Sequence, residues 1–199
     1  MERRRIDFLF KGDRQYIHGT DMFNATVGMH RAPLLRKIHF TIHGIVRNPS
    51  CELYESDSSE ELVNLQGVKM RANYQLAGAS RWIALSESAS THPSSRYDYP
   101  ENRIPSLCDV EKASIELQGE SPFTFIETVV AMNKHLHQKL FADALGQWMF
   151  VGIELPDGCD ARDQISLRVG HGVNYRLTRA QILLKGRPLG SLFFSLVRS

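Results

Sequence analysis

The sequence predicts an α+β protein of two pseudo-repeated units, each a central helix wrapped by an antiparallel sheet. Both halves start with a short alternating strand that ends in glycine and an acid, at 6–13 and 113–120, and continue with a helical segment and several strands. Between them, residues 86–108 are rich in serine and proline and show no periodicity, which is typical of a long loop. The expected division is 1–86 for the first unit, 87–111 for the linker and 112–199 for the second unit.

The composition is that of an ordinary globular protein and argues against several classes. Of the 199 residues, 42% are hydrophobic, and 24 Lys and Arg against 22 Asp and Glu leave a formal net charge of +2. Proteins that coat nucleic acid usually carry a strong basic excess, so we expect no nucleic-acid partner. The charged N-terminus lacks the apolar core of a signal peptide, and no stretch approaches the ~18 apolar residues of a membrane span. We therefore expect a cytoplasmic protein with no membrane partner.

The cysteines and histidines predict neither a disulfide framework nor a metal centre. Cys51, Cys108 and Cys159 lie far apart and form no Cys-x-x-Cys pair. His39 and His43 can share one face of a strand, but no third ligand accompanies them in the sequence pattern. We therefore expect no metal and no other cofactor.

The elements of the first half follow from their residue patterns. After the strand over 6–13, a helical segment is expected over 16–29. The low apolar content of 88–103 predicts a mobile segment that is accessible to proteases. The strand-like runs between the helix and this segment are 38–46, 73–76 and 82–86.

The second half contains the clearest helix of the sequence. Ser121 is a good N-cap and Pro122 a good first residue, so the helix is expected to start there. Its apolar stripe repeats with helical spacing and comprises Ile126, Val129, Val130, Leu136, Leu140 and Phe141. The strands expected after it are 148–155, 181–184 and 189–197, of which the last two form a hairpin across the turn that contains Gly186.

Two polar residues lie on the apolar side of this helix. Asn133 falls at the centre of the stripe, and His137 lies one turn further on. Because buried polar groups need hydrogen-bond partners, such a pair forms either satisfied hydrogen bonds in the core or the polar floor of a ligand cavity. The sequence leaves both interpretations open.

A strand, a long central helix and then a curved antiparallel sheet is an order that resembles the hot-dog superfamily, and two such units in one chain resemble a double hot-dog. The resemblance covers most of 6–197 and rests on element order and hydrophobic pattern. It implies an enzyme that acts on an acyl or polyketide thioester of coenzyme A or acyl carrier protein, as a thioesterase by hydrolysis or as a dehydratase by dehydration. The alternative is a non-catalytic domain that binds an acyl ligand or serves in assembly, and a homodimer is a further option.

The nearest local match is Tyr16-Ile-His18-Gly-Thr20, which looks like the histidine-containing loop before the central helix of the dehydratases. Here glycine follows the histidine directly. Some thioesterases use an acid in the early helix instead, and Glu127 in the second half and Asp21 in the first occupy such places.

The resemblance implies that residues from both units line one site, with His18 and Glu127 as the catalytic pair. A neutral His18 would serve as base, and Glu127 would orient it or position water. Purely structural roles are the alternative. The His18 side chain would then bond to backbone near the start of the helix, and Glu127 and Asp21 would complement the helix dipole. The residues expected to bind substrate are Asn133, Asp21, Gly19 and His137.

Overall fold

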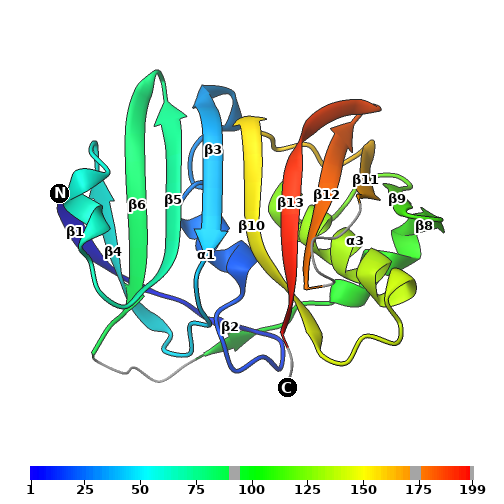
Figure 1. The fold of residues 1–199 in the computed structure, drawn as a ribbon, viewed down its shortest axis with the longest axis horizontal. Coiled ribbons are helices and arrows are strands. Elements are labelled where there is room, and N and C mark those ends of the chain that lie inside the picture. Colours follow the sequence, from blue (N-terminus) through cyan, green and yellow to red (C-terminus); the bar gives the residue numbers. More distant parts are fainter. Residues whose placement is uncertain (90–94, 171–175, 198–199) are drawn as a thin grey trace. The chain divides into compact units, whose positions relative to one another are not determined.

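The computed structural model describes residues 1–89, 95–170 and 176–197 (Figure 1). The chain forms two compact units, Met1–Pro100 and Glu101–Ser199, which are described one at a time. Within the described residues, no helix is both long enough and apolar enough to cross a membrane.

The first unit is built on five antiparallel strands in the order β1-β4-β6-β5-β3. Strands β5 and β6 are joined by a two-residue turn in which Ala77 and Gly78 both have positive φ, the backbone conformation of a type I′ hairpin. The strand bounds are Glu2–Asp7 for β1, Ser50–Ser56 for β4, Ala79–Glu87 for β6, Val68–Leu76 for β5 and Leu35–Ile42 for β3.

The core of the first unit lies on one face of these strands. Alternate side chains point to this face, as the period of a half-buried strand requires. A bulge between Arg36 and His39 shifts the alternation in β3. The buried side chains include Ile38, Phe40, Leu53, Met70, Ile83 and Leu85.

Helix α1 (Gly19–Ala25) packs on this sheet through an edge-to-face contact between Phe23 and Phe40. It has 7 residues, far fewer than the expected helix over 16–29. The Thr26 hydroxyl donates to the carbonyl of Met22 at 2.7 Å, and the backbone of Thr26 leaves the helical region. Such side-chain bonds to the preceding turn compete with helix continuation, and the β-branched Thr26 and Val27 that follow favour its end here.

A small parallel pair of strands lies beside this sheet. Strand β2 (Phe10–Lys11) pairs with β7 (Arg96–Tyr97), and the Arg96 guanidinium donates to the carbonyl of Gly12 at 2.9 Å. Part of the segment expected to be mobile, 88–103, is therefore hydrogen-bonded structure, whereas its residues 90–94 lie outside the described residues. Short helices complete the first unit: η1 (Ala32–Leu34) and α2 (Glu60–Val63).

The second unit has six antiparallel strands in the order β10-β13-β12-β11-β9-β8. The expected hairpin is confirmed, because β12 and β13 are joined at Lys185 and Gly186, which both have positive φ. The bounds are Gln147–Asp157 for β10, Arg187–Val197 for β13, Leu177–Leu184 for β12, Ile165–Val169 for β11, Ser114–Leu117 for β9 and Cys108–Glu111 for β8.

Helix α3 (Phe125–Leu140) packs against β9, β10 and β11 and is the long helix of Figure 1. The expected start at Ser121 is wrong by a few residues, because Thr124 is the N-cap and forms a capping box with Glu127. The Ser121 hydroxyl lies 2.6 Å from that of Thr128 instead. Two short 3-10 helices precede β8: η2 (Glu101–Arg103) and η3 (Pro105–Leu107).

The expected fold class, two units that each wrap a sheet around a central helix, is wrong. Within the described residues, the regular structure is mostly antiparallel strand, and α3 is the one main long helix. The first unit has the 7-residue α1 where a central helix was expected. Element order along the chain was a poor guide to helix length, because the end of α1 is set by the local hydrogen bond of Thr26.

The apolar stripe of α3 generates a stability prediction. Leu136 is fully buried, whereas Leu140, also expected in the core, is only half-buried. Leu136→Ala should lower the free energy of unfolding by about 2–5 kcal/mol because it removes core contacts and leaves a cavity. Leu140→Ala should cost less, and urea denaturation of both variants checks the order. A larger loss in Leu140→Ala would contradict this packing.

Candidate functional site

A buried polar cluster in the first unit joins β2, the start of α1 and the segment at β7. Lys11 ends β2 and is fully buried, which is rare for lysine. The remaining members come from α1 and from the β7 segment, two elements far apart in sequence. The cluster consists of Lys11, His18, Thr20, Asp21, Tyr97 and Tyr99.

The Lys11 ammonium is matched by polar groups. Its Nζ donates to Thr20 Oγ1 at 3.0 Å and to Asp21 Oδ1 at 3.2 Å. It also lies 3.9 Å from the ring centre of Tyr99, a cation–π distance. The Tyr97 hydroxyl donates to Asp21 Oδ1 at 2.8 Å. A buried charge is tolerated only when it is paired and hydrogen-bonded, and this ammonium meets both conditions.

His18 precedes this helix as its N-cap residue, with extended backbone angles. Its side chain makes no capping bond to the helix backbone. Its Nδ1 lies 2.8 Å from Thr20 Oγ1 instead, so the imidazole is held by the hydroxyl that Lys11 also contacts. Gly19, the first residue of α1, is buried. The predicted site residues His18, Gly19 and Asp21 therefore lie together at the start of α1.

His137 in the second unit is fully buried within α3. Its Nδ1 lies 2.8 Å from the carbonyl of Asn133, which can only accept, so Nδ1 carries the proton. Its Nε2 then accepts from the Thr178 hydroxyl at 2.6 Å. Burial lowers the pKa of His137 below its ordinary value. Both ring nitrogens thus have partners within the protein. Of the two interpretations that the sequence left open, the structure shows satisfied hydrogen bonds in the core for His137.

Asn133 differs from His137 although both lie on the buried side of α3. Its side chain is fully buried, and neither amide atom has a hydrogen-bond partner within the described residues. The indole Nε1 of Trp148 likewise has no hydrogen-bond partner within the described residues. The ring centre of Trp148 lies 4.6 Å from that of His137. A buried amide without partners costs about 1–3 kcal/mol per group, so this arrangement needs an explanation.

Glu127 has a structural task in the second unit. One carboxylate oxygen accepts from the Thr124 backbone N–H at 3.0 Å and from the Thr124 hydroxyl at 2.8 Å. These bonds close the capping box at the start of α3. The predicted pairing of Glu127 with His18 links residues of the two units and stays a prediction.

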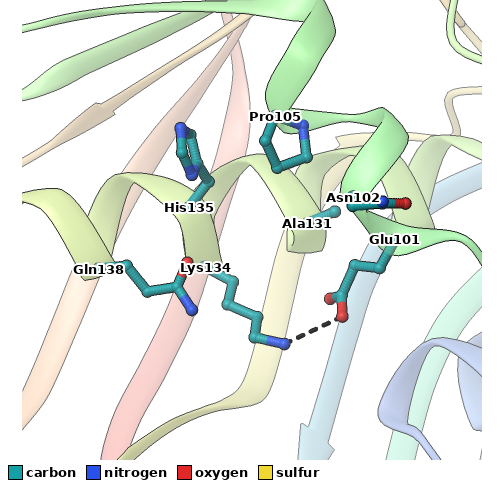
Figure 2. Close-up of a pocket in the computed structure, with 7 residues that line it drawn as sticks. All are labelled: Glu101, Asn102, Pro105, Ala131, Lys134, His135 and Gln138. Atoms are coloured by element: carbon teal, nitrogen blue, oxygen red, sulfur yellow. Dashed lines mark hydrogen bonds and ion pairs between the residues drawn. The ribbon is translucent and has the colours of Figure 1, made fainter.

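A cavity of about 230 Å³ lies along α3 near η2 and η3 (Figure 2). Figure 2 shows Lys134 and Glu101 directed toward one another, with their charged atoms 3.0 Å apart. Burial, followed by the charge of Lys139, lowers the pKa of His135 at this cavity. None of the predicted site residues lines it. The lining residues are Glu101, Asn102, Pro105, Ala131, Lys134, His135 and Gln138.

Sequence reasoning missed four members of the first-unit cluster, which are Lys11, Thr20, Tyr97 and Tyr99. Lys11 follows an alternating strand and precedes Gly12, a context in which a lysine is usually exposed. Tyr97 and Tyr99 lie in the segment that its composition marked as an open loop. The feature of the sequence that could have indicated this cluster is the pair of tyrosines in a segment rich in proline and serine. Within the described residues, no three His, Cys, Asp or Glu side chains gather into a metal-binding group.

Comparison with known proteins supports the fold. No protein-family model matches the chain, and no curated protein matches its sequence. A provisionally named thioesterase II from Thermobifida fusca YX is similar to it with a TM-score of 0.50 and 12% identity, over 100% of this chain and 93% of that one. The predicted resemblance to the hot-dog superfamily is confirmed at the level of the fold.

Two dehydratase domains give weaker matches. That of RzxB from Pseudomonas fluorescens has a TM-score of 0.47 and 12% identity, over 97% of this chain and 94% of that one. That of PpsC from Mycobacterium tuberculosis, solved in complex with C12:1-CoA, has a TM-score of 0.46 and 7% identity, over 98% of this chain and 94% of that one.

The lowered pKa of His137 predicts a pH dependence of stability. In the unfolded chain this imidazole takes up a proton near its reference pKa of ~6.5, whereas the folded protein resists protonation until a lower pH. The unfolded state thus binds more protons in this window, and the free energy of unfolding falls as the pH drops through it. His137→Gln should give a shallower fall between about pH 7 and about pH 5.5 in urea denaturation. An unchanged slope would contradict the assignment.

Proposed function

We propose that this protein acts on an acyl or polyketide thioester carried by coenzyme A or an acyl carrier protein, by hydrolysis or by dehydration. The observation that carries the proposal is the fold, which matches that of the provisionally named thioesterase II over the whole chain. Because one fold hosts many reactions, the proposal depends further on side chains with suitable chemistry.

His18 is the proton-transferring group of the proposal. It is half-buried before α1, and the Thr20 hydroxyl holds its ring in one orientation. Histidine exchanges protons near neutral pH, and a fixed orientation is what general acid–base catalysis requires. Glu127 is proposed to position water, while the bonds of its carboxylate to Thr124 favour a capping role as the alternative.

Asn133 is the substrate-binding residue of the proposal. Its amide offers both a donor and an acceptor in a buried place, and neither has a partner within the described residues. A thioester carbonyl and a neighbouring amide or hydroxyl would satisfy both. The roles predicted for Gly19, Asp21 and His137 stay predictions, and of these His137 has both nitrogens engaged.

A non-catalytic domain that binds an acyl ligand is the second candidate. The orphaned amide of Asn133 favours it, because this feature indicates a ligand without indicating a reaction. The two candidates differ in a single observable, which is whether an acyl thioester is converted or only retained.

Turnover of a panel of acyl-coenzyme A and acyl carrier protein thioesters, followed by mass spectrometry, tests the enzymatic proposal. His18→Ala and Glu127→Gln should each lower the turnover rate by about 10²-fold or more, as the loss of an acid–base group does. His43→Ala, which removes an exposed histidine of the same unit as His18, is the matched control. Retention of a thioester without conversion would reject the enzyme and support the binding domain.

A second prediction separates stability from function at Asn133. Asn133→Leu replaces an unsatisfied amide by an apolar group of similar size, so the free energy of unfolding should stay level or rise. Binding and turnover of the thioester should fall. Thr128→Val is the matched control, because this buried hydroxyl of α3 donates to the carbonyl of Thr124 at 2.9 Å. Its loss should cost about 1 kcal/mol. Equal destabilisation by both variants, measured by urea denaturation, would contradict the proposal for Asn133.

A further inference from the structure

The buried Lys11 has no part in the proposed reaction, and the core does not need its charge. A buried ion pair is often no more stabilising than apolar side chains of similar volume, so a fully buried ammonium calls for another explanation. The hydrogen bonds of Lys11 lead to Thr20, and from Thr20 to the imidazole of His18.

The protons of this chain of hydrogen bonds can be counted. An ammonium has three donors and no acceptor, so Thr20 Oγ1 accepts from Lys11. The Thr20 hydroxyl has one proton of its own, and its side chain is fully buried. In the part of the chain that the structure describes, its partners are Lys11 Nζ and His18 Nδ1. Because Lys11 cannot accept, the proton of the Thr20 hydroxyl goes to His18 Nδ1.

A neutral imidazole that accepts at Nδ1 carries its proton at Nε2. We propose that Lys11, acting through Thr20, holds His18 as this tautomer, with the proton on Nε2 and Nδ1 as the acceptor. Lys11 and Thr20 are then positioning residues. The tautomer goes beyond the proposed function and does not rest on it.

Asp21 completes the arrangement by balancing the charge of Lys11. Its Oδ1 accepts from Lys11 at 3.2 Å and from the Tyr97 hydroxyl at 2.8 Å. Donation therefore runs in fixed directions, from Tyr97 and Lys11 to Asp21, and from Lys11 through Thr20 to His18. The side chain of Asp21 is 12% exposed, so the pair is largely shielded from water, which would otherwise compete for these bonds.

Two-bond ¹H–¹⁵N correlation spectra of the histidine rings in the ¹⁵N-labelled full chain test this proposal. His18 is assigned by the signals that disappear in His18→Gln. At neutral pH we expect a pyridine-type shift for Nδ1 and a pyrrole-type shift for Nε2. A proton on Nδ1 would overturn the proposal.

Thr20 supplies a matched pair of variants. Thr20→Ser keeps the hydroxyl and should keep the wild-type shifts, whereas Thr20→Val should bring the two ¹⁵N shifts toward one another, because the tautomers then mix. Lys11→Met should act like Thr20→Val. Should Lys11→Met fail to fold, the charge-balanced double variant Lys11→Met/Asp21→Asn replaces it. Unchanged shifts in folded Thr20→Val, or in the folded Lys11 variant, would refute the positioning role.

The spectra and the turnover assay fail independently. If His18 carries its proton at Nε2 and the protein converts no thioester, the positioning role of Lys11 and Thr20 stands and the proposed function is rejected. If His18 carries its proton at Nδ1 and the protein converts a thioester, the positioning role is rejected and the proposed function stands. Where turnover is found, Thr20→Val should lower kcat about tenfold or more with a smaller change in KM, and Thr20→Ser should restore it.

Discussion

A charged ammonium group that is removed from water must be surrounded by acceptors, and this requirement organises the first unit around Lys11. Strand β2 brings the ammonium in, and the first turn of α1 supplies Thr20 and Asp21. The segment at β7 adds Tyr97, which bonds Asp21, and Tyr99, whose ring covers the charge. Three elements are thereby joined at a single buried charge.

Polar groups organise the second unit in a different way. The capping box fixes the start of α3, and His137 ties the helix to β12 through Thr178. Aromatic rings from β10 and β13, those of Trp148 and Phe194, lie against the imidazole. Asn133 lies one turn away on the same helix and has no such partner within the described residues. The buried side of α3 thus holds one residue whose polar side-chain groups are satisfied within the protein and one whose amide has no partner within the described residues.

Patterns that depend on neighbouring residues were predictable from the sequence. The apolar stripe identified α3, and the turn at Lys185 and Gly186 identified the last hairpin. The start of α3 was misplaced because Ser121 and Pro122 resemble a helix start, whereas the capping box of Thr124 and Glu127 satisfies more backbone groups.

Contacts between residues that are distant in the chain could not be predicted from the sequence. Nothing near Lys11 in the chain indicates that it is buried, since the groups that accept its charge and cover it come from α1 and the β7 segment. The candidates at the start of α1, among them His18 and Asp21, came from resemblance to a family and remain predictions. Thr20 was missed as a partner of His18 because the significance of its hydroxyl depends on the buried ammonium.

The short length of α1 has a consequence for folding. A helix of 7 residues is too short to persist alone in water, so its helical state depends on tertiary contacts. Its Asp21 bonds Tyr97, which is 76 residues away in the chain, and closing so long a loop has an entropic cost that no local turn offsets. Helix α3 has its own cap and 16 residues, whereas the bond from Tyr97 to Asp21 of α1 forms only with the β7 segment in place. The two helices therefore depend to different degrees on contacts between distant parts of the chain.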